Sequence, residues 1–273
     1  MVENTNDMEE VWELPDDFNL FASHEIRKVV YPKDLYEESA EEHFFKIECI
    51  EPDSPLDILN KDTSALDYDA TGHCVWVGAF LLICSIKKLY EKYEFENKTL
   101  IEFGAGTGIA GLSIFLAKHR PSEICFTDYD PAALEICERS CKLNDLKEDS
   151  YSTRQITWGE EIEGGSRTYD IALATDVLYD VDLIKPLFST VGETIDENGI
   201  FILSHIPRAC FNENNPPEAV EDLEKYIIDQ ARLYNFEVDE IIKPPETVPE
   251  EMKNWVSNQA FRNGAVIVFR KSQ

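Results

Sequence analysis

A cluster of glycines behind an acidic residue is the segment of this sequence best suited to bind a reactive ligand. Residues 99–108 read Thr-Leu-Ile-Glu-Phe-Gly-Ala-Gly-Thr-Gly, an apolar strand that runs into a turn. Glycine permits positive φ and lets the backbone approach a ligand closely. The apolar run from Ile109 to Ala117 predicts a helix whose N-terminal amides point at that ligand. The segment therefore predicts a nucleotide-binding turn that contains Gly104, Gly106 and Gly108.

Two ligands fit this turn, and they differ in charge. Residues 106–111 match the G-x-G-x-x-G pattern of dinucleotide sites. From Glu102 onward the segment reads E-x-G-x-G-x-G, the first motif of S-adenosylmethionine-dependent methyltransferases. A dinucleotide places a pyrophosphate on the helix N-terminus, whereas S-adenosylmethionine carries an ammonium, a carboxylate and a sulfonium, so Glu102 favours S-adenosylmethionine. Asp128, at the end of the next strand, predicts a ribose contact in either case.

Apolar runs and breaks along the chain predict alternating strands and helices. One strand is expected at residues 43–50, before the nucleotide-binding fold, and seven more at residues 99–103, 123–128, 152–158, 169–174, 199–205, 236–242 and 265–270. Helices are expected at residues 75–90, 109–119, 131–141, 181–195 and 218–234. The alternation indicates an α/β fold with a Rossmann-like, mostly parallel sheet. No clear helix precedes the last strand, so strand seven is expected to run antiparallel. A seven-stranded sheet with one reversed strand is typical of class I methyltransferases, and it leaves no second domain for a hydride acceptor.

Four segments, in this order, resemble the eukaryotic family-16 protein methyltransferases. They are Gly72–Ala79, Glu102–Gly108, Ile156–Gly159 and Asp176–Tyr179. The first resembles the family's G-x-x-V-W-x-x-A segment and the second matches its cofactor loop. The third resembles a hydrophobic-x-Trp segment, and the fourth matches a D-x-x-Y signature. The resemblance runs from about residue 72 to the C-terminus. It implies an N-methyltransferase that uses S-adenosyl-L-methionine to modify a protein side chain, most often lysine, with histidine- and arginine-modifying relatives.

Asp176 and Tyr179 are the candidate catalytic residues. They follow the strand expected at residues 169–174, and ligands bind at the carboxyl ends of strands in open α/β sheets. Methyl transfer to an amine is an in-line displacement, so positioning of the neutral nitrogen should matter more than strong base catalysis. A carboxylate at Asp176 can hold the amine, while Tyr179 walls the channel or accepts a hydrogen bond. The alternative for Asp176 is a cap for the helix that starts near Val181.

Cofactor contacts are expected from several separate segments. They are Trp76, Glu102, Gly104, Gly106, Gly108, Asp128, Trp158 and Thr175. By resemblance, Trp158 lies against the adenine, whereas Trp76 either lines the pocket or is buried within its apolar helix. His205, at the end of a strand beside the site, is a candidate substrate contact. The spacing of cysteine and histidine predicts no metal site.

The net charge of the chain limits the kinds of molecule that it can bind. The net charge is -29 over 273 residues, which repels phosphate backbones and argues against nucleic acid as a substrate. It either attracts a basic, lysine-rich protein or serves solubility alone. Residues 1–17 contain seven acidic residues and no Lys or Arg. We therefore expect an acidic N-terminal arm and extension of unknown role over residues 1–70, followed by a methyltransferase domain over residues 71–273.

The sequence has no signal peptide and no apolar run near about 18 residues, so we expect no membrane partner. The expected protein is a monomer in the cytoplasm, with a nuclear location also open, that acts on a protein substrate. Three other interpretations stay open. They are a methyltransferase for histidine, arginine or a small amine, a catalytically silent binding module, and a nucleotide-dependent oxidoreductase.

Overall fold

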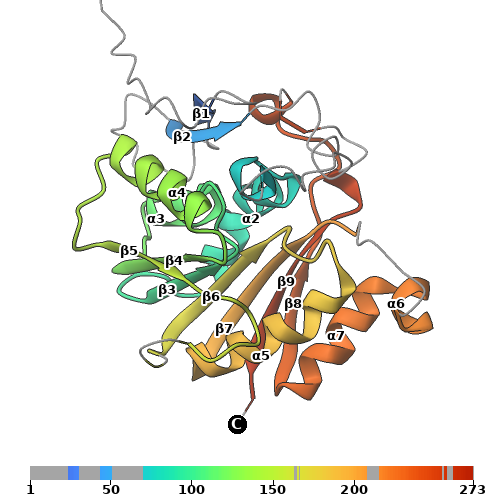
Figure 1. Ribbon diagram of the computed structural model, residues 1–273. Helices are drawn as coiled ribbons and strands as arrows, with labels where there is room; N and C mark the ends of the chain where they lie inside the picture. Colours follow the sequence, from blue (N-terminus) through green and yellow to red (C-terminus); the bar gives the residue numbers. More distant parts are fainter. Residues whose placement is uncertain are drawn as a thin grey trace, which may run out of the picture.

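A seven-stranded sheet runs through the molecule in the order β5-β4-β3-β6-β7-β9-β8 (Figure 1). The computed structural model describes residues 24–30, 44–50, 70–162, 165, 167–207, 215–253, 255–256 and 261–272. The strands of the sheet are β3 (Thr99–Phe103), β4 (Glu123–Asp128), β5 (Tyr151–Gln155), β6 (Tyr169–Thr175), β7 (Ile195–His205), β8 (Phe236–Ile242) and β9 (Ala265–Lys271). Strands β3 to β7 run parallel, whereas β9 pairs antiparallel with both β7 and β8. The predicted sheet, with its last strand reversed, is confirmed.

Helices cover both faces of this sheet. They are α2 (Val77–Lys92), α3 (Ile109–Phe115), α4 (Pro131–Leu143), α5 (Ile184–Thr194), α6 (Pro217–Glu221) and α7 (Leu223–Leu233), with short 3-10 helices η4 (Ala70–His73), η5 (Val181–Leu183) and η6 (Glu250–Met252). In Figure 1, α2, α3 and α4 lie on one face and α5 and α7 on the other. The single helix predicted at residues 218–234 is instead two helices. Asp222 separates them, because its backbone is extended and its side chain accepts a hydrogen bond from the Lys225 amide to cap α7.

The central strands are buried on both faces, as is usual for a parallel sheet. Along β3, Leu100 packs into the core formed with α2 and α3, whereas Ile101 and Phe103 pack into the core beneath α5. Successive side chains of a strand point to opposite faces. Glu102 therefore shares the face of Leu100, toward α3.

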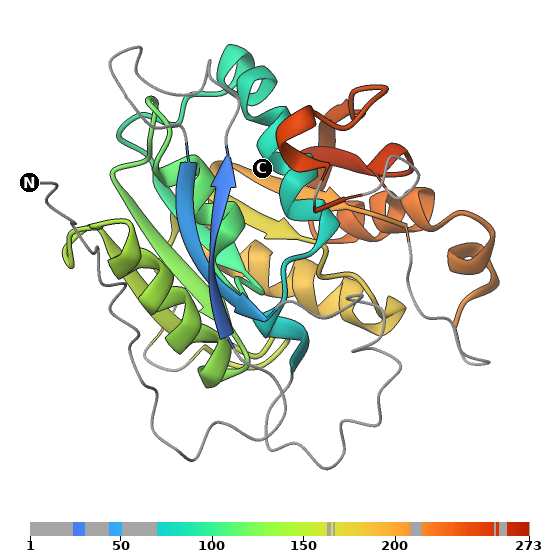
Figure 2. The same cartoon turned by 90° about the horizontal axis from the view of Figure 1, so that it is seen from above.

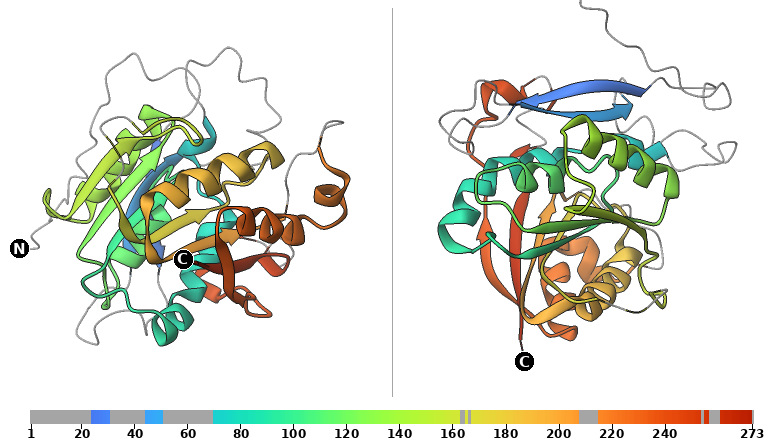
Figure 3. Two further views of the ribbon diagram at one scale, coloured as in Figure 1. Left: turned by 90° about the horizontal axis from the view of Figure 1, so that it is seen from below. Right: turned by 90° about the vertical axis from the view of Figure 1, so that its left-hand side faces the viewer.

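A two-stranded hairpin lies outside the main sheet. It is formed by β1 (His24–Val30) and β2 (Phe44–Ile50), which pair antiparallel. Figure 2 shows the hairpin (blue) nearest the viewer, and the right-hand view of Figure 3 shows it above α4. The Glu48 amide donates to Ser140 Oγ at 3.0 Å, and Arg139 Nε lies 2.8 Å from a Glu48 carboxylate oxygen. These contacts fix β2 to α4.

The hairpin belongs to the region that was expected to be an N-terminal extension. The strand predicted at residues 43–50 is found as β2. The acidic segment at residues 1–17 lies outside the described residues, so the acidic arm and the division at residue 70 stay predictions. No helix within the described ranges is both long and apolar enough to cross a membrane.

Helix α3 packs so closely on the sheet that Gly111 has no room for a side chain. A Cβ atom there would lie 2.5 Å from Ile124 Cδ1 and 2.7 Å from Phe126 Cε1, and would also collide with Glu102 Oε2. The Gly111 amide donates to that same Glu102 oxygen at 2.9 Å. The third glycine of the apparent dinucleotide pattern is thus explained by helix packing.

We expect Gly111→Ala to lower the free energy of unfolding by about 1–3 kcal/mol, because the added methyl group must displace well-packed neighbours. Gly192 in α5 provides a matched control, since the nearest atom to an added Cβ is 3.9 Å away. Gly192→Ala should leave stability unchanged or raise it by up to about 1 kcal/mol. Urea unfolding followed by circular dichroism measures both variants. Equal stability of the two would contradict the tight packing of α3.

Candidate active site

The loop between β3 and α3 is built from glycines that no other residue can replace easily. Gly104, Gly106 and Gly108 have φ values of 63°, 52° and 76°, a region that residues with a Cβ rarely adopt. Space is also restricted. A Cβ on Gly104 would lie 2.7 Å from Val177 Cγ1, and a Cβ on Gly106 would lie 2.8 Å from the Gly72 carbonyl oxygen. The loop is therefore held against its neighbours by close backbone contact.

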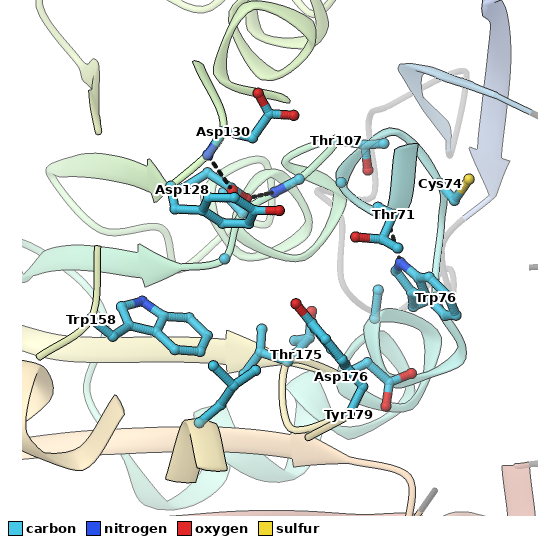
Figure 4. Close-up of a pocket in the computed structure, with 18 of the residues that line it drawn as sticks. Thr71, Cys74, Trp76, Thr107, Asp128, Asp130, Trp158, Thr175, Asp176 and Tyr179 are labelled. Carbon is cyan, nitrogen blue, oxygen red and sulfur yellow. Dashed lines mark hydrogen bonds between the residues drawn. The ribbon is translucent and has the colours of Figure 1, made fainter. Parts of the chain in front are cut away.

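This loop borders a cavity of about 350 Å³ at the carboxyl ends of β3, β4 and β6. The volume lies in the range of small-molecule pockets. In Figure 4, Trp158 stands at one end of the cavity and Trp76 at the other, with Asp128 above and Tyr179 below. The expected site residues that line the cavity are Trp76, Gly104, Gly106, Asp128, Trp158, Thr175, Asp176 and Tyr179.

Glu102 and Gly108 are the two expected cofactor residues that do not line the cavity. The Glu102 side chain is buried under the loop, where it accepts the Gly111 amide, and burial raises the pKa of its carboxyl well above the usual value. The expected direct contact between Glu102 and the cofactor therefore does not fit this geometry, and Glu102 instead anchors the start of α3. Gly108 forms the N-cap of α3, and a Cβ there would lie 2.5 Å from Cys137 Sγ, so Gly108 shapes the loop from behind.

Asp128 is a buried carboxylate at the cavity wall. Its Oδ2 accepts the Gly106 amide at 2.9 Å and its Oδ1 accepts the Asp130 amide at 3.1 Å. Burial is the main cause that raises its pKa to about 6. Asp128 is therefore ionised at neutral pH, and a carboxylate can accept hydrogen bonds from two neighbouring hydroxyl groups. This chemistry suits a ribose.

Asp176 has a structural role that the sequence did not reveal. Its backbone is left-handed, with φ of 58°, and only 5% of the residue is exposed. Oδ2 accepts the Gly78 amide in the first turn of α2 at 2.7 Å, and Oδ1 accepts the Ile206 amide after β7 at 3.1 Å. A carboxylate at the N-terminus of a helix is also favoured by the helix dipole. Asp176 thus fixes the start of α2, and Figure 4 shows its carboxylate directed away from Trp158.

The alternative role for Asp176 was a cap for the helix after it, but a different residue supplies that cap. Asp180 caps the turn before α5, where its side chain accepts the Asp182 amide at 2.9 Å. Asp176 does act as a cap, but of the distant helix α2. Its predicted role in holding the amine remains a prediction, because both carboxylate oxygens already accept backbone amides.

The two tryptophans line the cavity and are only half-buried. Trp76 Nε1 donates to the Thr71 carbonyl at 2.9 Å, which fixes the indole in the wall. Trp158 lies against the loop, because a Cβ on Gly104 would be 3.4 Å from its Cζ2. His205 is 3% exposed and is not part of the lining, so the structure does not place it for contact with a substrate.

Several lining residues were missed. They include Thr71, Cys74, Thr107, Asp130 and Leu183. Asp130 carried a signal, because an Asp directly before a Pro at the start of a helix is a typical cap, and its side chain does accept the Ala132 amide at the start of α4. Thr107 lies inside the glycine loop, and its buried hydroxyl has no hydrogen-bond partner within the described part of the chain. This hydroxyl offers a partner to a polar ligand.

The strand order, the reversed strand and the glycine loop beside the cavity define the Rossmann-like fold of class I methyltransferases. The sequence pattern of the lysine methyltransferase family matches residues 53–215, more than half of the chain. The chain belongs to this family. The predicted family membership and the predicted cofactor, S-adenosyl-L-methionine, are thereby confirmed.

Curated relatives share part of the sequence. Protein N-lysine methyltransferase METTL21A of Xenopus tropicalis is 29% identical over 132 residues, covering 48% of this chain and 58% of the relative. Methyltransferase-like protein 22 of Homo sapiens is 32% identical over 160 residues, covering 51% and 38%. EEF1A lysine methyltransferase 3 of Xenopus tropicalis is 29% identical, covering 43% and 50%. The chain thus spans about half the length of the curated relatives it matches.

A solved structure has a similar arrangement at low identity. The putative S-adenosylmethionine-dependent methyltransferase from Listeria monocytogenes has a TM-score of 0.49 and is 15% identical, covering 70% of this chain and 98% of that one.

We expect Asp176→Ala to lower the free energy of unfolding by about 2–4 kcal/mol, because two buried amides lose their charged acceptor. Asp176→Asn keeps one acceptor oxygen and tolerates positive φ, so it should cost about half as much. Asp180→Ala, which removes a cap at a more exposed position, serves as the control and should cost about 1 kcal/mol. Chemical unfolding measures all three. Wild-type stability of Asp176→Ala, together with lost methyl transfer, would assign Asp176 to the amine alone.

We expect the affinity for S-adenosylhomocysteine to depend on the ionisation of Asp128. Because the pKa is raised to about 6, the carboxylate accepts ribose hydroxyls above that pH and is protonated below it. Affinity should therefore fall as the pH drops through 6, by at most about tenfold per pH unit. Isothermal calorimetry between pH 8 and pH 5 measures this affinity. Asp128→Asn should bind weakly, and its affinity should lack the fall near pH 6. An identical slope in both proteins would assign the titration to another group.

Proposed function

We propose that this chain transfers a methyl group from S-adenosylmethionine to a side-chain nitrogen of a protein, with lysine as the acceptor. One observation supports this above all others. A single cavity places the glycine loop, Asp128 and Trp158 on one side and Trp76 and Tyr179 on the other. The first set suits a nucleoside with a polar tail, and the second leaves an aromatic wall for an alkyl amine. The relatives named as protein-lysine methyltransferases support the same acceptor.

The residues present fit the methyl donor. Asp128 would hold the ribose, and the flat face of Trp158 would lie against the adenine. The buried Thr107 hydroxyl, which has no partner within the described residues, would bond the polar tail. When bound, S-adenosylmethionine supplies an electrophilic methyl group on a sulfonium.

The protein's part in the reaction is to position the nitrogen and to remove water from it. A lysine ammonium must lose a proton before it can attack, and an apolar environment lowers its pKa. Trp76 and Tyr179 provide such surroundings, and both are half-buried in the cavity wall. The Tyr179 hydroxyl can accept a hydrogen bond from the amine and so orient its lone pair. Correct alignment supplies much of the rate enhancement in such displacements.

The substrate we propose is a protein that is basic around its target residue. Acidic side chains lie close in sequence to two lining residues. Glu160 and Glu161 come after Trp158, and Asp180 and Asp182 come after Tyr179. Within the described ranges Glu160, Glu161 and Asp182 are exposed. With a net charge of -29, such a surface would speed encounter with a positively charged partner. We also propose that the protein acts as a monomer in the cytoplasm, with the nucleus as an alternative location.

The acceptor can be tested by transfer of a labelled methyl group into a cell lysate, followed by mass spectrometry of the modified residue. We expect label on lysine side chains of a small set of basic proteins. Label on histidine, arginine or a small amine would contradict lysine as the acceptor and would still support methyl transfer as the reaction. Binding of S-adenosylhomocysteine without any labelling would indicate a silent binding module, and binding of NADH in its place would indicate an oxidoreductase.

A pair of variants shows that the label comes from this chain. Gly106→Ala should abolish labelling, because a Cβ would lie 2.8 Å from the Gly72 carbonyl at a positive φ. Gly192→Ala should label as the wild type does, since its added methyl group meets no atom closer than 3.9 Å. Full labelling by Gly106→Ala would contradict the assignment of the loop to the methyl donor.

A further inference from the structure

The short helix η4 forms one wall of the cavity and lies directly on the cofactor loop. Thr71 and Gly72 of η4 line the cavity. The Gly72 carbonyl lies so close to Gly106 that a Cβ there would be 2.8 Å from it. The Thr71 carbonyl accepts the Trp76 indole N–H. The position of η4 therefore fixes both the loop beside it and the tryptophan at the far end of the cavity.

The last residue of η4 joins this wall to the N-terminal hairpin. His73 is 1% exposed. Its Nδ1 lies 3.3 Å from Nε2 of His24, the first residue of β1, and the two rings are 5.3 Å apart between centroids. Its Nε2 lies 3.6 Å from Oδ2 of Asp130, which itself lines the cavity. Three polar side chains thus run in sequence from the hairpin to the cavity.

We propose that His24 is a positioning residue of the methyl-donor site, acting through His73 on η4 and Asp130. This inference rests on the proposed function of the cavity. It gives the hairpin, which was expected to be an extension of unknown role, a part in cofactor binding.

The two rings can share one hydrogen bond. A neutral imidazole donates from one nitrogen and accepts at the other, so the bond between His24 Nε2 and His73 Nδ1 needs an N–H on one of these two atoms. Burial is the main cause that lowers the pKa of His24, against the opposing effect of Glu48, so His24 is a neutral ring at neutral pH. Its side chain therefore takes part in this bond either as donor or as acceptor.

The hairpin does not depend on His24 for its attachment. Besides the bonds of Glu48 to Ser140 and Arg139, the Lys46 amide donates to Asn144 Oδ1 at 2.8 Å. Removal of the His24 side chain should therefore leave the hairpin on α4 and free only η4. This separates an effect on the site from a loss of the fold.

Calorimetric titration of the full chain with S-adenosylhomocysteine tests the proposal. His24→Phe keeps a ring but has no donor, and we expect its affinity to fall about three- to tenfold with little change in melting temperature. His24→Gln keeps an N–H near the same position and should bind within about twofold of wild type. His119→Phe is the matched control, because His119 is exposed and its ring centroid lies 5.6 Å from that of Tyr90. This variant should bind S-adenosylhomocysteine as the wild type does.

Wild-type affinity of His24→Phe would overturn the proposal and leave the proposed function intact. The proposal would also be overturned if His24→Phe and His24→Gln lowered the affinity and the melting temperature equally, because the ring of His24 would then act only in packing. A wild-type protein that binds no S-adenosylhomocysteine would overturn the proposed function itself, and this inference with it.

Discussion

Buried carboxylates that accept backbone amides hold the walls of the cavity together. Glu102 binds the start of α3, and Asp128 binds the glycine loop itself. Asp176 binds the start of α2 and the end of β7, while Asp130 caps α4. Hydrogen bonds to a charged acceptor are stronger than those between neutral groups. Each of these bonds fixes an element that lines or supports the cavity.

The same bonds limit what these acids can do chemically. A carboxylate that accepts backbone amides is a poor general base, because those hydrogen bonds stabilise its charged form and fix its orientation. Burial raises the pKa of Glu102 and Asp128, which reflects the cost of removing charge from water. Methyl transfer from a sulfonium to a neutral amine requires little base strength, so rigid acids are compatible with this reaction. The proposed reaction would depend on alignment, and Tyr179, which lines the cavity, is the side chain that we propose orients the acceptor.

Local patterns in the sequence, together with the family resemblance, predicted the sheet, the loop and eight of the 22 residues that line the cavity. The apolar strands, the glycines at 104, 106 and 108, and Asp128 each have a short-range reason to be where they are. The role of Asp176 could not be predicted, because its partners Gly78 and Ile206 are 98 and 30 residues away along the chain. The buried position of Glu102, by contrast, could be predicted from the sequence. Strand alternation places it on the face of Leu100, toward α3 and away from the open end of the loop.

The part of the chain that matches the family does not contain every element near the cavity. The match covers residues 53–215, which include the loop, Trp76, Trp158 and Tyr179. The hairpin formed by β1 and β2 lies before it, and β8 and β9 lie after it. The reversed strand β9 completes the sheet beside β7, so it acts on the fold as a whole. The hairpin pairs with no strand of that sheet, and its described contact with the cavity wall runs through a pair of histidines. A contact of this kind can change without disturbing the sheet, so the hairpin can alter how firmly the cavity wall is held while the methyl-donor loop stays the same.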